Sequence, residues 1–271
     1  FLNFKFMKVP YYIVNAFSKI SFSGNPTGVC ILEDWLSTDD LQKIASQTQM
    51  AETVFLFPSD SKQWSIRWFS PLVEKDLSGH GTLAAAHILL EEGFSDGNQA
   101  FNFSSCGGRL KVEKRTEGIL RLEMDILKAR SCVASPLLVE GLGAYPDETF
   151  VGMDCLCVFS DESIVRELQP EPRLLKRIGS ARGIIVTAKS YDSKFDYVTR
   201  FFSPRLGVDE DEVTGSIHGL LVPYWFKKLG KVEMRSKQLS PRGTSVICGI
   251  EESFVWIEGY ADTFLRGEIT L

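Results

Sequence analysis

The sequence lacks the features that mark several classes of protein. No apolar run approaches the roughly 18 residues that a membrane helix requires. Residues 1–6 lack the hydrophobic stretch and the cleavage site of a signal peptide. The net charge is −5 and there is no basic block, so the electrostatic footprint of a nucleic-acid-binding protein is missing. We therefore expect a cytoplasmic protein with neither a membrane nor a nucleic acid as its partner.

Sequence signatures of metal sites and disulfide scaffolds are missing as well. The 6 cysteines form no CxxC pair, and none has a histidine at zinc-binding spacing. Only Cys155 and Cys157 lie close together, and the alternation of a strand would place both on one face. Because most cysteines have apolar or β-branched neighbours, we expect buried, reduced thiols and no metal ion.

The composition is that of an ordinary globular protein. Hydrophobic residues make up 44% of the chain and charged residues 24%. The length of 271 residues suffices for one large domain or for two of about 130 residues each. A linker is predicted between Lys128 and Gly143, where Pro136 and two glycines interrupt the periodicity.

The most informative feature is an internal repeat. The segment RWFSP at 67–71 precedes a glycine turn and the apolar run 83–90, and RFFSP at 200–204 precedes a second turn and the apolar run 217–226. In the first copy 9 residues separate Pro71 from Gly81, and in the second 10 separate Pro204 from Gly215. The alignment extends backward to Ala51-Glu52 and Ala181-Arg182, so only the first half has an acid there. We interpret the repeat as a duplication of one structural unit.

Such a duplication predicts a ligand site. The first amides of a helix have no partner within the helix, and the helix dipole adds partial positive charge there. Two helix starts that face each other across a cleft would bind a carboxylate or a phosphate.

Local patterns predict a β-rich chain with few helices. Strands are expected at 10–16, 28–32, 51–57, 64–69, 100–104, 110–114 and 119–124. A strand or a strand pair is expected at 149–158, and further strands at 183–187, 197–202, 232–236, 245–250 and 254–258. Helices are expected at 39–48, 81–91, 163–168, 173–178 and 217–229, the last with a kink at Pro223.

Glu52 is the strongest candidate for chemistry. It stands at the entry of the apolar strand 51–57, where partial desolvation would favour the protonated carboxyl group. A carboxyl group tuned in this way suits general acid/base catalysis near neutral pH. The alternative is a glutamate that flanks the strand and points into water.

Three histidines allow different interpretations. His80 stands between two glycines at a helix start, where it would act as a proton donor or shuttle facing a bound anion; the alternative is a surface residue of the turn. His87 and His218 lie within apolar helices and are expected to be hydrogen-bonded core residues.

Polar residues around the second turn also have two interpretations. The acidic run 209–212 suits a solvated helix start, but one member would equally suit a cleft opposite Glu52. The hydroxyl groups of Thr82 and Ser216 suit either helix capping or the binding of a substrate carboxylate.

Taken together, these motifs resemble those of the PhzF-like family, the phenazine-biosynthesis isomerases with the diaminopimelate epimerase fold. The matching segments occur in the family's order and cover almost the whole chain from Lys8 onward: SGNP at 23–26, AET at 51–53, RWFSP at 67–71, DLSGHGT at 76–82, DEVTGS at 211–216 and SPRG at 240–243. The resemblance implies an α+β fold of two pseudo-symmetric domains, each a curled, mostly antiparallel sheet around a central helix, with the active site between them. The domains are expected at 8–128 and 129–258, and the segment 259–271 is expected to return to the first.

The resemblance also implies site residues. The family's catalytic glutamate falls on Glu52, with His80 and Asp211 as further catalytic residues. The expected substrate-binding residues are Asn25, Gly79, Gly81, Gly215 and Ser216. Members resemble isomerases that need no cofactor and form homodimers.

Three departures from the family pattern concern the turns. Related epimerases and racemases use two opposed cysteines, whereas the matching positions here are Ser78 and, approximately, Glu212, so two-thiol racemisation is not expected. Glu212 also replaces the usual proline, and Asn15 stands where an aspartate is common.

The function predicted from the sequence is therefore an isomerase that moves a proton along a small carboxylated substrate, whose identity the sequence leaves open. The alternative is a non-catalytic protein that keeps the cleft to bind a metabolite or a partner. A cysteine-dependent hydrolase is disfavoured because neither turn contains a cysteine.

Overall fold

A computed structural model of the chain describes residues 7–60, 63–95, 100–106 and 108–271. The polypeptide forms two compact units, of which the first comprises 1–120 with 260–271 and the second 121–259. The predicted boundary at 128 falls inside the second unit, in the loop after strand β8 (Leu120–Asp125). Residues 1–6, whose lack of a signal peptide was noted from the sequence, lie outside the described residues.

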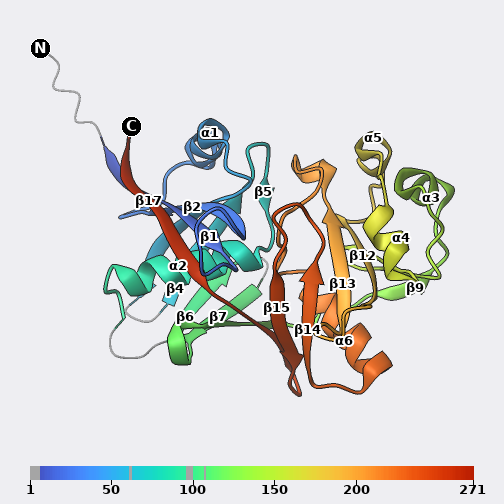
Figure 1. Ribbon diagram of the computed structural model, residues 1–271. Coiled ribbons are helices and arrows are strands. Elements are labelled where there is room, and N and C mark those ends of the chain that lie inside the picture. Colours follow the sequence, from blue (N-terminus) through green and yellow to red (C-terminus); the bar gives the residue numbers. More distant parts are fainter. Residues whose placement is uncertain (1–6, 61–62, 96–99, 107) are drawn as a thin grey trace, which may run out of the picture. The chain divides into compact units, whose positions relative to one another are not determined.

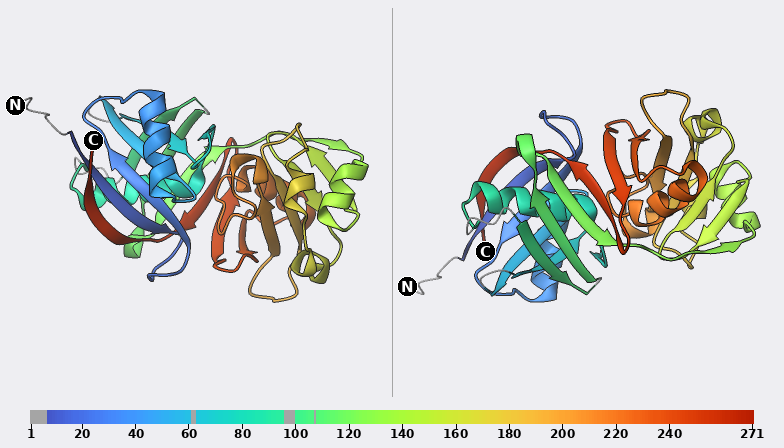
Figure 2. Two further views of the ribbon diagram at one scale, coloured as in Figure 1. Left: turned by 90° about the horizontal axis from the view of Figure 1, so that it is seen from above. Right: turned by 90° about the horizontal axis from the view of Figure 1, so that it is seen from below.

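The first unit is a mixed sheet in the order β17–β1–β2–β3–β4–β6–β7. Strands β2 and β3 and strands β4 and β6 pair in parallel, and the other neighbours are antiparallel. The last strand of the chain therefore lies beside the first, which both views of Figure 2 show as red beside dark blue. The strands are β1 (Lys8–Ala16), β2 (Asn25–Ile31), β3 (Thr53–Asp60), β4 (Gln63–Phe69), β6 (Ala100–Ser105), β7 (Gly108–Lys114) and β17 (Ala261–Thr270).

Two helices pack on this sheet (Figure 1). Helix α2 (Gly79–Glu91) contacts β1, β2, β3, β7 and β17, and most of its residues are fully buried, as expected of a helix that is apolar on all sides. Helix α1 (Thr38–Thr48) contacts β3 and β4 and buries only Leu41, Ile44 and Ala45. The Ser37 side chain accepts a hydrogen bond from the Asp40 amide and so caps α1, which confirms the predicted helix start.

The second unit repeats this sheet. Its strands follow the order β9–β10–β11–β12–β13–β14–β15–β16–β8, and β11–β12 and β13–β14 are the parallel pairs. From β1 and from β10 onward, the two units share one sequence of antiparallel and parallel neighbours. The strands are β9 (Arg130–Cys132), β10 (Glu148–Val151), β11 (Cys155–Val158), β12 (Ile184–Lys189), β13 (Tyr197–Phe202), β14 (Glu233–Gln238), β15 (Ser245–Ile250) and β16 (Phe254–Gly259).

Helix α6 (His218–Leu229) is the counterpart of α2. Each helix lies in the chain between the two strands of the second parallel pair of its unit, which are β4 and β6 in the first and β13 and β14 in the second. The helix continues through Pro223, whose ring removes the donor for the carbonyl of Gly219. That carbonyl accepts a hydrogen bond from the Leu127 amide at 3.0 Å instead. A core of Leu142, Cys157, Val165, Val186 and their neighbours forms beneath three short helices, α3 (Pro136–Leu142), α4 (Glu162–Glu167) and α5 (Pro172–Leu175).

These observations confirm the predicted α+β fold and most of the predicted elements. The sequence did not predict α3, β9 or β17, and the segment 149–158 is two paired strands. The thiols of Cys155 and Cys157 lie 3.9 Å apart on one face of β11, as alternation predicts, and all 6 cysteines are free. No helix in the described part of the chain is long and apolar enough to cross a membrane.

Candidate active site

In each unit, an arginine–glutamate ion pair fixes the backbone just before the central turn. In the first, Arg67 Nε and Nη2 each lie 2.7 Å from the Glu74 carboxylate. In the second, Arg200 makes the same two-pronged contact with Glu210, at 2.7 and 2.9 Å. The two arginines occupy equivalent strand positions, because Phe69 and Phe202, two residues beyond each, pair with Thr53 and Ile184.

These pairs reveal the true register of the duplication. Three residues separate each bridging glutamate from a hydroxyl residue, Ser78 in the first unit and Thr214 in the second. The predicted match of Ser78 with Glu212 is therefore wrong by two positions. The match of Glu52 with Arg182 is also wrong, by one residue. Strand register makes Thr53 of the first unit equivalent to Ile184 of the second, so the residue equivalent to Glu52 is Gly183.

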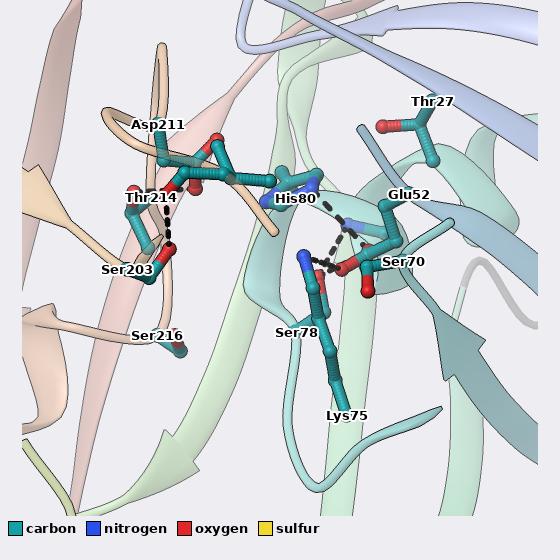
Figure 3. A network of polar contacts seen from close by, with 12 residues as sticks. Thr27, Glu52, Ser70, Lys75, Ser78, His80, Ser203, Asp211, Thr214 and Ser216 are labelled. Carbon is teal, nitrogen blue, oxygen red and sulfur yellow. Dashed lines mark hydrogen bonds and ion pairs between the residues drawn. The ribbon is translucent and has the colours of Figure 1, made fainter. Parts of the chain in front are cut away.

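Glu52 lies immediately before β3, and its carboxyl group is fully buried with three polar partners (Figure 3). The Ser78 hydroxyl donates to Oε1 at 2.5 Å, and His80 Nε2 lies 3.3 Å from the same oxygen. The Lys75 ammonium lies 3.0 Å from Oε2. The alternative in which Glu52 points into water is wrong, since its exposed fraction is 0%.

The start of α2 brings these partners together. Ser78 caps the helix, its hydroxyl oxygen accepting from the Gly81 amide at 3.1 Å while the same hydroxyl donates to Glu52. A side chain at Gly81 would place its Cβ 2.1 Å from Glu52 Oε1, so only glycine leaves room for the carboxyl group. The Gly81 amide is thus already paired, and the contribution of this residue is the space that it leaves.

The remaining predicted residues of the first unit lie at strand and helix starts. His80 is 2% exposed, so the surface-turn alternative is wrong for it as well. Gly79 is the first residue of α2, and Asn25 is the buried first residue of β2, paired in register with Ala16. Asn15, the departure noted in the sequence, is also buried, one position before Ala16 on β1.

In the second unit, Asp211 opens a turn that is held closed by a single amide side chain. Thr214 Oγ1 donates to the Asp211 carboxylate at 2.6 Å, a contact that Figure 3 shows at close range. Gln238 donates to the Asp211 carbonyl at 2.7 Å and accepts from the Thr214 amide at 2.9 Å. Because Gln238 bonds to both ends of the turn, it fixes the presentation of Asp211.

Glu212 ties this turn to the SPRG segment at 240–243. Its carboxylate accepts from the Arg242 amide at 2.8 Å, and its carbonyl accepts from the Ser240 hydroxyl. The glutamate that replaces the family's usual proline thus supplies a side-chain contact that a proline does not have.

Ser216 lies in the same turn, beside a buried ion pair. Arg182 Nη2 donates to Ser216 Oγ at 2.9 Å and to Asp154 at 2.6 Å, and Arg182 Nε adds a second bond to Asp154 at 3.0 Å. Asp154 is fully buried and also accepts from the Gly183 amide. Since the Ser216 oxygen accepts from arginine, its own proton is directed to another acceptor. Gly215, directly before it, contributes a carbonyl that accepts from His218.

The two other histidines are both hydrogen-bonded, as predicted, but only His218 is a core residue, because His87 is partly exposed. His218 is fully buried, its Nδ1 lies 2.9 Å from the Tyr197 hydroxyl, and burial lowers the pKa of its ring to about 3. His87 lies 3.0 Å from the Thr263 hydroxyl, and burial lowers its pKa while Glu91 opposes this shift. No cluster of metal-binding side chains occurs in the described ranges.

The structure thus gathers Glu52, His80, Gly79 and Gly81 in the first unit, and Asp211, Gly215 and Ser216 in one turn of the second. Sequence reasoning missed the residues that support them: Lys75, Gln238, Asp154 and Arg182 in its present role. Each acts on a partner more than 20 residues away along the chain, so local patterns carried no signal for them.

Known proteins that match this chain share its full length. A family model described as "Phenazine biosynthesis-like protein" matches residues 14–136 and 144–264. An "uncharacterized isomerase" of Halalkalibacterium halodurans is 40% identical over 273 residues, covering 98% of this chain and 100% of that protein. The crystal structure of a PhzF-family protein from Enterococcus faecalis is 37% identical, with a TM-score of 0.87 over 98% of this chain and 100% of that one.

The fold extends to epimerases of distant sequence. A hydroxyproline epimerase from Agrobacterium vitis has a TM-score of 0.69 at 10% identity, over 97% of this chain and 93% of that chain. The twofold repeated epimerase-like architecture expected from the sequence is therefore confirmed.

Proposed function

Because this chain belongs to the phenazine biosynthesis-like family, several of whose members are named isomerases, we propose that it is a cofactor-independent isomerase that moves a proton on a small carboxylated substrate. The observation that carries the proposal is the fully buried carboxyl group of Glu52, held by a hydroxyl and an ammonium group, with the His80 imidazole 3.3 Å away. Acid/base groups are commonly found in such dry, polar sites.

The proposed reaction uses Glu52 for both proton transfers. A C–H bond of the substrate breaks next to a π-system, the proton forms an O–H bond on Glu52, and the electron pair delocalises into the substrate. Glu52 then returns the proton to another carbon of the same molecule. Exclusion of water between the two steps keeps the proton from exchanging with solvent.

Other residues are proposed to orient the substrate. His80 lies 3.3 Å from Glu52, within reach to relay a proton or to contact the reacting group. Asp211 is proposed as a second orienting residue, together with Asn25. The hydroxyl of Ser216, whose oxygen already accepts from Arg182, is suited to donate to a substrate carboxylate. Gly79, at the start of α2, and Gly215, in the turn before α6, would supply main-chain donors.

The proposal is tested by hydrogen exchange at carbon. Small carboxylic acids with a carbon–carbon double bond or a carbonyl group are incubated with the protein in D₂O, and the products are followed by proton NMR. The expected result is an isomerised product, with deuterium at carbon wherever solvent has entered, for wild type and a large loss for Glu52→Gln. Saturable binding of an acid without either isomerisation or exchange would instead identify a non-catalytic binding protein.

A homodimer, which the family resemblance implies, is part of the proposal. Light scattering on the purified full chain should give the mass of two polypeptides of 30.4 kDa each. A mass of one polypeptide at micromolar concentration would reject it.

A further inference from the structure

The Lys75 side chain contacts one of the two carboxyl oxygens of Glu52 in the candidate site. Its side chain is 10% exposed, and its ammonium group lies 3.0 Å from Oε2 of Glu52, whereas Ser78 and His80 both approach Oε1. The two carboxyl oxygens therefore have different partners, and of these three groups it is the Lys75 ammonium that approaches Oε2. Figure 3 shows its extended chain reaching Glu52 from the side of Ser78.

The backbone beneath Lys75 is fixed. Lys75 ends the two-residue strand β5 (Glu74–Lys75) and pairs in register with Trp68 of β4. The preceding residue, Glu74, is held by the two-pronged contact with Arg67. The ammonium group consequently reaches Glu52 from a backbone that is already ordered, so only the rotamers of the lysine side chain must be fixed to form the contact.

Comparison of the two units shows that this cation is not a feature that they share. One residue after the other bridging glutamate, Glu210, the chain carries Asp211, an acid, where the first unit carries Lys75. Gly183 occupies the place of Glu52 in that unit, so no carboxylate there requires a cation at the equivalent position. The lysine and the buried glutamate occur together in one half and are both missing from the other.

We propose that Lys75 is a positioning residue that holds Glu52 ionised in the empty site, so that Glu52 starts the cycle as a base. A carboxyl group withdrawn from water takes up a proton unless a cation or several donors stabilise its charge. His80 provides such a charge only when it is protonated itself. Lys75 provides it without a proton transfer.

The consequence for catalysis rests on the proposed function. When Glu52 takes the substrate's proton, its own charge is neutralised and a negative charge appears on the substrate. Lys75 keeps its proton throughout, and its attraction passes from the Glu52 carboxylate to the new anion. Lys75 thus favours a substrate whose carbanion, formed by loss of the carbon-bound proton, spreads its charge onto an oxygen of a neighbouring carboxyl group.

The test needs no substrate. The full chain is labelled with glutamate carrying ¹³C in the side-chain carboxyl group, and the Glu52 resonance is assigned by its loss in Glu52→Gln. At neutral pH wild type and Lys75→Arg should show a carboxylate shift, and Lys75→Met a carboxylic-acid shift. A carboxylate shift at neutral pH in folded Lys75→Met would overturn the inference.

A second measurement compares the stabilities of the variants. Denaturant unfolding of wild type, Glu52→Gln, Lys75→Met and the double variant forms a thermodynamic cycle. If Lys75→Met does not fold, the inference predicts that the double variant does fold, and an unfolded double variant would contradict it. The double variant should recover part of the stability lost in Lys75→Met, whereas additive losses would contradict a charge partnership. Failure of both measurements leaves the proposed isomerase reaction untouched, and absence of isomerisation and exchange with every acid leaves the partnership of Lys75 and Glu52 intact.

Discussion

The two halves of the molecule share a frame but differ in the charges that it carries. Each has the same succession of strand pairings, an arginine–glutamate pair before its turn and a hydroxyl residue four positions later. The first half then carries Glu52 and Lys75, and the second Gly183 and Asp211 at the same places. In the second half a cation, Arg182, instead lies beside Ser216, balanced by the buried Asp154.

This difference shows how a duplicated fold can acquire one active acid/base group. The frame, which is backbone pairing and a partly buried ion pair, tolerates changes at a few inward-facing positions. Gly183 shows the other outcome of such a change, because a Cβ there would lie 2.4 Å from the ring of Phe201, leaving no room for a carboxyl group. The predictions below compare matched changes in the two halves.

The largest effect is expected on catalysis. Glu52→Gln keeps the shape of the side chain but removes the base, so the isomerisation rate should fall by about 10²–10⁴-fold. Asp211→Asn, in the other half, should cost less because Asp211 is proposed to orient the substrate. Rates are measured by NMR on any acid that the screen identifies, and an Asp211→Asn loss exceeding that of Glu52→Gln would reverse the assignment of roles.

Next in size is the buried ion pair of the second half. Asp154→Ala removes the carboxylate that balances the charge of Arg182, whose side chain is 9% exposed, so unfolding should be easier by about 3–5 kcal/mol. Lys228→Met, which removes a pair with side chains 45% and 39% exposed, is the control and should change stability by less than about 1 kcal/mol. Urea unfolding of both variants measures these losses. Equal losses of unfolding free energy would contradict the distinction between the buried and the exposed ion pair.

Adding a methyl group to one glycine in each half separates activity from stability. Gly81→Ala and Gly183→Ala both force a Cβ into occupied space, at 2.1 Å from Glu52 and 2.4 Å from Phe201, so each should cost about 1–3 kcal/mol. Only Gly81→Ala displaces the Glu52 carboxyl group, and it should lose more activity than its effect on stability accounts for. A fully active Gly81→Ala protein would show that the position of Glu52 is not critical.

The smallest effect, taken per pH unit, is on the pH dependence of stability, and it compares His218 of α6 with His87 of α2. Burial lowers the pKa of His218 to about 3, below the unfolded value of about 6.5. Between these values the unfolded chain binds a proton that the folded chain does not, so stability should fall with decreasing pH, by about 1.4 kcal/mol per pH unit.

The variants His218→Gln and His87→Gln test this slope. His218→Gln should flatten it, and His87→Gln should change it less because Glu91 opposes the lowering of the His87 pKa. Unfolding free energies of both variants and of wild type are measured across the acid range. An unchanged slope in His218→Gln would show that His218 does not contribute to the pH dependence of stability.

Sequence reasoning predicted the parts of the fold that depend on local pattern. Alternating strands, the start of α1 and the two apolar helices all carry their signal within a few residues. Strand β17 was missed because its pairing with β1 joins residues at opposite ends of the sequence, as the Lys8–Glu268 pair illustrates.

The candidate site was predicted only in outline, for a related reason. Burial of Glu52 was one of the two interpretations that its apolar neighbours allowed, but its contact with Lys75 depends on how β5 pairs with β4. The repeat was aligned on its glycines, whereas α2 begins at Gly79 and α6 at His218, so similar turns start helices at different residues. Only strand register and the arginine–glutamate pairs show which positions correspond.

The central claim is that one carboxyl group, Glu52, carries the substrate's proton from one carbon to another. The most direct measurement follows a substrate labelled with deuterium at the carbon to be deprotonated, converted in ordinary water by the wild-type protein. The account predicts that part of the deuterium appears at the new carbon of the same molecule and that Glu52→Gln abolishes this transfer. Deuterium found entirely in the solvent, together with an undiminished rate in Glu52→Gln, would contradict it.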